Sequence, residues 1–334
     1  MREGQQTWRF ARKPVIVGSA AVGGPFEASH PLSDDFDTLH GDTWLGQDSW
    51  EQAEKVLLEE AANKAVEKAG LTNDKIQFFL AGDLLNQIIS ASFAARTLSV
   101  PYLGLFGACS TTTEALALAS LLVDSQSAEY VLAATCSHNG SAEKQFRYPT
   151  EYGSQKPPTA QWTVTGAGAA VVAGQGSGPR VTSATIGRVV DMGISDPFNM
   201  GGAMAPAALS TIEAHFRDRR LPFDYYDLVV TGDLGRVGHS ILSELLPRHQ
   251  IAIPLERYVD CGVLIYGDDP AVQAGGSGAA CCAVVTYGHL LNRMRAGELR
   301  RILVVATGAL LSPLSYQQGE SIPCIAHAVS IEAE

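Results

Sequence analysis

Short, continuously apolar runs alternate along this chain with segments in which apolar residues recur at helical spacing. The run IQFFLAG (76–82) is typical of a buried strand, because it is apolar almost throughout and too short for an ordinary helix. Residues 49–70 predict a helix, because apolar residues recur there at positions 53, 57, 61, 62 and 66. Ser49 is a suitable N-cap and Gly70 a suitable end for this helix.

The remaining segments follow a similar alternation of strands and helices, which is typical of α/β proteins. Residues 21–48 are rich in Gly, Pro, Asp and His and predict a long loop. Predicted strands cover residues 14–20, 101–107, 130–135, 164–174, 179–187, 227–233, 301–312 and 322–332, and predicted helices cover 90–99, a segment opening near Cys109, 206–219 and 277–294.

Three strings of the first half return in the second half in the same order. FFLAGDL (78–84) resembles LVVTGDL (228–234), and YVLAAT (130–135) resembles ILVVAT (302–307). Between them, ACSTTTEAL has its counterpart in ACCAVVTYG. An internal repeat sets the architecture. We therefore predict two duplicated α/β halves, residues 1–175 and 176–334, forming a five-layered αβαβα arrangement.

The net charge of −11, from 24 basic and 35 acidic residues, includes no Lys/Arg-rich run. Nucleic-acid binding needs such a basic surface, so we expect none. No apolar run is long enough for a transmembrane helix, and the N-terminal segment lacks the apolar core of a signal peptide. The six cysteines lack zinc-site spacing, so we expect reduced thiols in a cytoplasm and no metal site. The Gly-rich strings match no nucleotide-binding motif, and we expect no cofactor.

Cys109 is the most informative residue, because it lies where a buried strand turns into an Ala/Leu-rich helix. The positive end of a helix dipole favours the thiolate and can depress the pKa of a cysteine there. Such a thiol is a candidate nucleophile. The alternatives are a thiol that lines a pocket and a small residue that fills space at a crowded helix start.

The two α/β halves, with a cysteine opening the central helix of the first, resemble the thiolase-like superfamily of thiolases and ketoacyl-carrier-protein synthases. Within it, the chain resembles most closely the stage V sporulation protein AD family of spore-forming bacteria. The resemblance spans almost the whole chain. The strings QFRYPTEYG (145–153) and TGALLSP (307–313) are not general to thiolases and make it specific. Further strings are LAGDLLNQ (80–87), LFGACSTTTEAL (105–116), ATCSHN (134–139), AGGSGAACCAVVT (274–286) and SIPCIAHAV (321–329).

The resemblance implies a homodimer that binds dipicolinic acid (pyridine-2,6-dicarboxylate), alone or as its calcium chelate. It implies a role in the uptake of that compound into the developing spore, beside other stage V sporulation proteins embedded in the membrane. The expected location is the cytoplasmic face of the forespore or inner spore membrane, in peripheral association.

Condensing enzymes of this superfamily use a thiolate with a His and a second His or Asn, and thiolases use a His and a second Cys. Local matching places the slot of the first His on or beside Gly232, with Asp233 next, and that of the Asn near Gly276. Glycine supplies no general acid or base. We therefore expect no catalysis. The alternative is an active acyl-transferase or condensing enzyme with Cys109 as nucleophile, paired with His138.

A dicarboxylate ligand needs fixed donors, and arginine pairs well with carboxylates. Arg147 lies in a polar, aromatic loop, and Ser137 and His138 follow a strand. Asp83 and Asn86 follow another strand, where the Asp could orient a donor or meet calcium through oxygen. The expected ligand-binding residues are Cys109, Ser137, His138, Arg147, Asp83 and Asn86.

Overall fold

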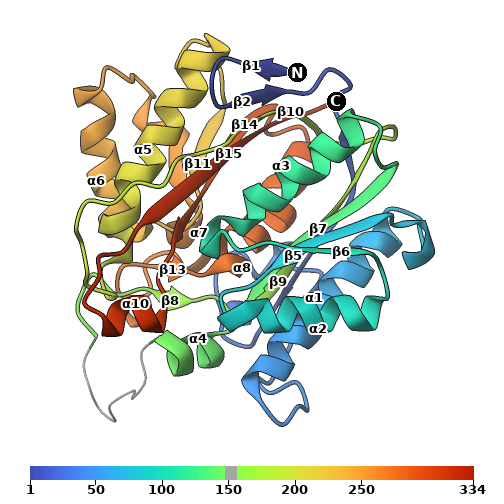
Figure 1. Ribbon diagram of the computed structural model, residues 1–334, viewed down its shortest axis with the longest axis horizontal. Helices are drawn as coiled ribbons and strands as arrows, with labels where there is room; N and C mark the ends of the chain where they lie inside the picture. Colours follow the sequence, from blue (N-terminus) through green and yellow to red (C-terminus); the bar gives the residue numbers. More distant parts are fainter. Residues whose placement is uncertain (147–155) are drawn as a thin grey trace.

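The computed structural model describes residues 1–146 and 156–334. Ten strands of the described chain form one hydrogen-bonded path in the order β12-β11-β14-β15-β10-β3-β9-β7-β5-β6 (Figure 1). The first five in sequence are β3 (Val15–Gly23), β5 (Phe78–Gly82), β6 (Tyr102–Gly104), β7 (Tyr130–Ser137) and β9 (Gly166–Ala173). The second five are β10 (Arg180–Thr185), β11 (Leu228–Thr231), β12 (Tyr258–Asp260), β14 (Arg301–Ala309) and β15 (Cys324–Glu332).

The two sets of strands have the same order and the same directions. In the first set β3, β9 and β7 pair antiparallel, and β7, β5 and β6 pair parallel. In the second set β10, β15 and β14 pair antiparallel, and β14, β11 and β12 pair parallel. The sets meet where Arg180 of β10 pairs with Val15 of β3. This is a duplicated α/β unit, as the repeated strings predict.

The two sets of strands form two layers, and helices form the other three (Figure 1). The outer layer of the first half contains α1 (Trp50–Lys68) and α2 (Ile89–Leu98), and that of the second half contains α5 (Met200–Arg219) and α6 (Gly235–Arg248). The middle layer contains α3 (Thr111–Asp124) and a helical segment made of α8 (Ala279–Val284), a π-helical turn (Val285–Leu290) and α9 (Leu291–Arg295). The predicted five-layered αβαβα arrangement is therefore confirmed.

Local sequence explains the best-predicted helix. The Ser49 side chain accepts the Gln52 N–H and caps α1, and Gly70, with a φ of +70°, follows its end. In the middle layer, small side chains such as Ala115 of α3 and Ala280 of α8 are fully buried. Such residues let the two central helices pack within one core with the flanking strands.

Several elements differ from the sequence prediction. Helix α5 begins at Met200 rather than at Pro206, because burial of Ala203, Met204 and Ala205 stabilises a turn ahead of the proline. The sequence did not predict α4 (Asn139–Phe146), α6, α7 (Cys261–Tyr266), α10 (Pro313–Gln317) or β12. Short strands also went unpredicted, namely β1 (Arg2–Glu3), β2 (Thr7–Arg9), β4 (Thr38–Leu39), β8 (Trp162–Thr163) and β13 (Gly276–Ser277). Within the described residues, no helix combines the length and apolarity needed to cross a membrane.

Candidate ligand-binding site around Cys109

Cys109 lies in the 3-10 turn Ala108–Ser110 that leads directly into α3. Ala108 has a φ of +49°, a left-handed conformation that non-glycine residues rarely adopt. The end of β14 lies against this turn, since a Cβ on Gly308 would be 2.3 Å from the Gly107 carbonyl oxygen. Glycine is therefore required at Gly308, which gives one physical reason for the TGALLSP string.

The Cys109 side chain opens onto a cavity of about 40 Å3. Apolar side chains dominate the wall, and three polar side chains, those of Cys109, Thr163 and Ser277, interrupt it. The lining contains no histidine, asparagine or cationic side chain among the described residues. The full lining is Leu84, Phe106, Ala108, Cys109, Ala142, Phe146, Thr163, Met200, Ser277, Ala309 and Leu311.

A buried carboxylate lies behind the Cys109 thiol. Asp233 is fully buried, and its Oδ1 accepts the Thr307 hydroxyl at 2.7 Å. Its Oδ2 accepts the backbone N–H of Gly278 at 3.0 Å and the Ser277 hydroxyl at 3.3 Å. In the repeat, Asp233 corresponds to Asp83, and local matching predicts the first histidine of a synthase on or beside the neighbouring Gly232. The structure thus places an acid, rather than an imidazole, beside the thiol.

Electrostatics at this thiol are opposite to what the helix start predicts. Burial, reinforced by the Asp233 carboxylate, raises the pKa of the Cys109 thiol well above its ordinary value. Of the alternatives for Cys109, an activated nucleophile is therefore disfavoured, because desolvation and a neighbouring anion outweigh the effect of the helix end on the thiol pKa. Burial also raises the pKa of Asp233 from 3.8 to about 6, so this carboxyl is mostly ionised at pH 7.

His138 makes its hydrogen bonds within the protein. Its Nε2 donates to the Thr43 carbonyl at 2.9 Å, and its Nδ1 accepts the Gly140 N–H at 3.0 Å. The ring stacks on Trp50 with centroids 6.5 Å apart, and burial lowers its pKa. His138 is absent from the cavity wall, and both of its nitrogens are engaged, so neither is free to take a proton from Cys109.

Ser137 and Asp83 also bind neighbouring backbone. The Ser137 hydroxyl donates to the Val164 carbonyl at 2.8 Å and accepts the Ala280 N–H at 3.1 Å. The two Asp83 oxygens accept the N–H groups of Leu85 and Ala91, each at 2.7 Å. These two side chains hold the turns around the site, and neither lines the cavity.

Of the remaining predicted residues, Asn86 is exposed in the 3-10 turn before α2, and its backbone N–H donates to the Gln145 side chain at 2.9 Å. Arg147 lies outside the described residues. Among the six predicted residues, only Cys109 lines the cavity within the described chain.

Sequence reasoning missed most of the wall. Phe106 and Leu311 lie in the LFGACS and TGALLSP strings, so their neighbourhood was identified without their role. Phe146 and Met200 lie on helix turns that periodicity did not predict. Ser277 had a signal, because it belongs to the AGGSGAA turn where a synthase carries its asparagine.

A second buried cluster lies close to the site. It consists of Glu54, Asp83 and Cys136, whose ligand atoms lie within 4.8 Å of one another, a spacing that could hold a metal ion. However, Glu54 already accepts the Ser141 hydroxyl at 2.5 Å, and both Asp83 oxygens accept backbone N–H groups. Burial, reinforced by the Asp83 carboxylate, raises the pKa of Glu54 well above its ordinary value. Internal hydrogen bonds therefore account for the arrangement of this cluster.

Comparison with known proteins agrees with this architecture. Solved structures with the same fold include 3-oxoacyl-acyl-carrier-protein synthase III from Aquifex aeolicus VF5, at 16% identity and a TM-score of 0.57, covering 96% of this chain and 99% of that one. Another is acetamide-bound OleA from Xanthomonas campestris, at 15% identity and a TM-score of 0.61, covering 99% and 100%. At these identities the likeness shows the thiolase-like fold alone.

Sequence similarity is more specific. Residues 4–332 match the family model described as stage V sporulation protein AD (SpoVAD). The stage V sporulation protein AD of Bacillus subtilis (strain 168) is 52% identical over 330 residues, covering 98% of this chain and 97% of that protein. The chain, with its thiolase-like fold, therefore belongs to the stage V sporulation protein AD family.

Proposed function

We propose that this protein is a non-catalytic member of the thiolase-like fold that binds dipicolinic acid in the cavity beside Cys109 and supports its uptake into the developing spore. The observation that carries the proposal is the pairing of the Cys109 thiol with the buried Asp233 carboxylate. A condensing enzyme needs a thiolate and a base that can hold its proton. Here the Asp233 carboxylate disfavours the Cys109 thiolate, while a cavity is still present in front of the thiol.

The lining suits an aromatic ligand. Phe106, Phe146 and Met200 offer apolar contact to a pyridine ring, and the hydroxyls of Thr163 and Ser277 offer polar contact. The observed volume of about 40 Å3 holds only a few water molecules. Binding therefore requires wall side chains to move, and Phe106, which is 49% exposed, is the least confined of them.

The charge of the ligand needs a counterpart. No cationic side chain lines the cavity among the described residues, and Asp233 adds a negative charge behind it. We propose that Arg147, which follows the wall residue Phe146 in sequence, or a calcium ion chelated by the ligand, supplies the positive charge. Calcium suits this role because it binds carboxylate oxygens readily.

The proposal includes a homodimer and peripheral contact with membrane-embedded sporulation proteins. Support for the dimer comes from β6, which ends the strand path and leaves Leu103 47% exposed. An unpaired apolar edge strand is a surface that other chains cover readily.

The experiment is complementation of a Bacillus subtilis strain that lacks its own stage V sporulation protein AD, with spore dipicolinate as the readout. A Cys109→Ser variant preserves the size of the side chain but removes the thiol. A binding role predicts normal dipicolinate with this variant, because no chemistry passes through the sulfur. If Cys109→Ser behaves as the deletion does while the purified variant folds normally, the acyl-transfer alternative gains and the non-catalytic reading fails.

A further inference from the structure

A second, wider cleft lies far from Cys109. Its volume is about 860 Å3, and Arg301, the first residue of β14, lies in its wall. Ala309, the last residue of the same strand, lines the Cys109 cavity. Eight strand steps separate the two residues, which corresponds to roughly 26 Å. The cleft is therefore a separate feature of the fold, and its volume is within the range of small-molecule sites.

Three arginines line this cleft, namely Arg295, Arg300 and Arg301. They belong to the segment 293–301, which contains four of the 24 basic residues of an acidic chain. Within the described residues, none of the three forms an ion pair with a carboxylate. Arg295 donates to the Ser19 hydroxyl at 2.9 Å, and the guanidinium of Arg301 lies 4.4 Å from the centre of the Tyr225 ring.

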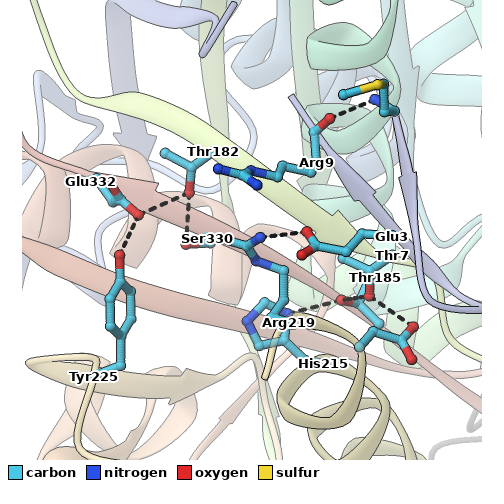
Figure 2. Close-up of polar contacts among 12 residues, drawn as sticks. Glu3, Thr7, Arg9, Thr182, Thr185, His215, Arg219, Tyr225, Ser330 and Glu332 are labelled. Atoms are coloured by element: carbon cyan, nitrogen blue, oxygen red, sulfur yellow. Dashed lines mark hydrogen bonds and ion pairs between the residues drawn. The ribbon is translucent and has the colours of Figure 1, made fainter. Parts of the chain in front are cut away.

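Two acids, Glu332 and Glu334, line the same cleft, and their carboxylates accept hydrogen bonds from other side chains. Figure 2 shows the carboxylate of Glu332 held by the hydroxyls of Tyr225 and Thr182, at 3.0 and 3.2 Å. Glu334 pairs with Arg180 at 3.1 Å and accepts the Ser177 hydroxyl at 2.8 Å. These contacts hold the two carboxylates with other donors, and no described side chain forms an ion pair with Arg300 or Arg301. Arg295 also donates to the Asn292 side chain at 3.4 Å.

A structural role explains only part of this arrangement. Arg293 and Arg295 lie in the last turn of α9, where positive charge complements the helix dipole, and Arg293 also pairs with Glu298 at 3.0 Å. Arg300 and Arg301 lie beyond the helix, so that reason does not apply to them. Met294 and Leu299 add apolar side chains to the wall of the same cleft.

We propose that this cleft binds a phosphate-bearing anion of two or more negative charges, through Arg295, Arg300 and Arg301. A guanidinium group can donate two parallel hydrogen bonds to the oxygens of one phosphate. Three guanidinium groups at one cleft can therefore hold a multivalent anion, although the net charge of the protein is negative. The same chemistry fits a soluble phosphate ester and the headgroup of an anionic phospholipid.

The test is calorimetric titration of the full protein with inorganic pyrophosphate at low ionic strength. Cosedimentation with phosphatidylglycerol vesicles, and with phosphatidylcholine vesicles as the neutral reference, forms the second arm. The test variant is Arg295→Gln with Arg300→Gln, both of them exposed side chains. The matched control is Arg248→Gln, an exposed arginine on α6. Thermal unfolding of each variant shows that it folds.

We expect saturable binding in at least one arm, and added salt should weaken it. The double variant should lose at least roughly tenfold in affinity, because charge-assisted hydrogen bonds are lost. Pyrophosphate binding alone identifies a soluble anion as the ligand, and binding to phosphatidylglycerol identifies a headgroup. Absence of binding in both arms overturns the proposal, as does an equal loss in Arg248→Gln. The outcome is independent of dipicolinate binding, because the two sites lie at opposite ends of β14.

Discussion

Replacing Asp233 by asparagine tests whether a buried, ionised carboxylate really stands behind the Cys109 thiol. Burial raises the pKa of Asp233 from 3.8 to about 6. Below pH 3.8 the carboxyl is protonated in both the folded and the unfolded chain, so it has no pH-dependent effect. As the pH rises towards 6 the unfolded chain loses this proton first, and the folded state loses stability. Above pH 6 the full penalty is present.

The size of the penalty follows from the two pKa values. At 1.36 kcal/mol per unit, the difference corresponds to roughly 3 kcal/mol. The Asp233→Asn variant lacks this titration, whatever fixed cost it has from altered hydrogen bonds to Gly278 and Ser277. Because the unfolded carboxyl is already more than half ionised at pH 4, the stability of the variant relative to the wild type should rise by roughly 2.5 kcal/mol between pH 4 and pH 7.5.

Differential scanning fluorimetry across this pH range measures the effect. For a chain of this length, roughly 1.4 °C accompanies each kcal/mol, so the difference between the two melting temperatures should change by roughly 3 to 4 °C. Asp268→Asn is the matched control, because its carboxylate is fully exposed. Parallel curves for Asp233→Asn and the wild type would refute the reasoning, since they would mean that Asp233 titrates as a solvated acid.

Three further predictions concern the same region. Iodoacetamide should alkylate Cys109 slowly at pH 7.5 in the wild type and faster in Asp233→Asn, as measured by peptide mass spectrometry. Rapid alkylation of the wild type would contradict the raised pKa of the thiol. His138→Ala should destabilise the protein by roughly 2 to 4 kcal/mol through two lost hydrogen bonds and the lost contact with Trp50, whereas unchanged urea unfolding would show that these contacts contribute little. Ser49→Ala should cost about 1 kcal/mol through loss of the α1 cap, and a neutral result in the same assay would exclude that role.

Much of the fold could be predicted from local pattern. The strand 76–82 and helix 49–70 are each specified by a continuous apolar run or a capped helical period, and both are present. Helix α4 was missed, because it is short and only two residues, Ser141 and Ala142, are buried along it. The π-helical turn at Val285–Leu290 was also invisible, since it changes the hydrogen-bond pattern without changing the apolar sequence.

The site was harder to predict, because its chemistry depends on partners distant in sequence. The position of Cys109 at a helix start was correct, but the pKa of its thiol is raised first by burial and then by Asp233, 124 residues away. Likewise, nothing near His138 in sequence reveals that the Thr43 carbonyl occupies its Nε2. Residue type and strand position locate a candidate pocket, whereas tertiary contacts decide which side chains are free to act in it.

The most direct measurement of the central claim is calorimetric titration of the purified protein with dipicolinic acid, with benzoate and acetyl-coenzyme A as controls. A non-catalytic dipicolinate-binding role predicts saturable binding of dipicolinate to the wild type and to Cys109→Ser, and loss of binding in Ala142→Leu, where the larger side chain fills the cavity. It predicts no turnover of acetyl-coenzyme A. Absence of dipicolinate binding to the wild type, or consumption of acetyl-coenzyme A that Cys109→Ser abolishes, would contradict it.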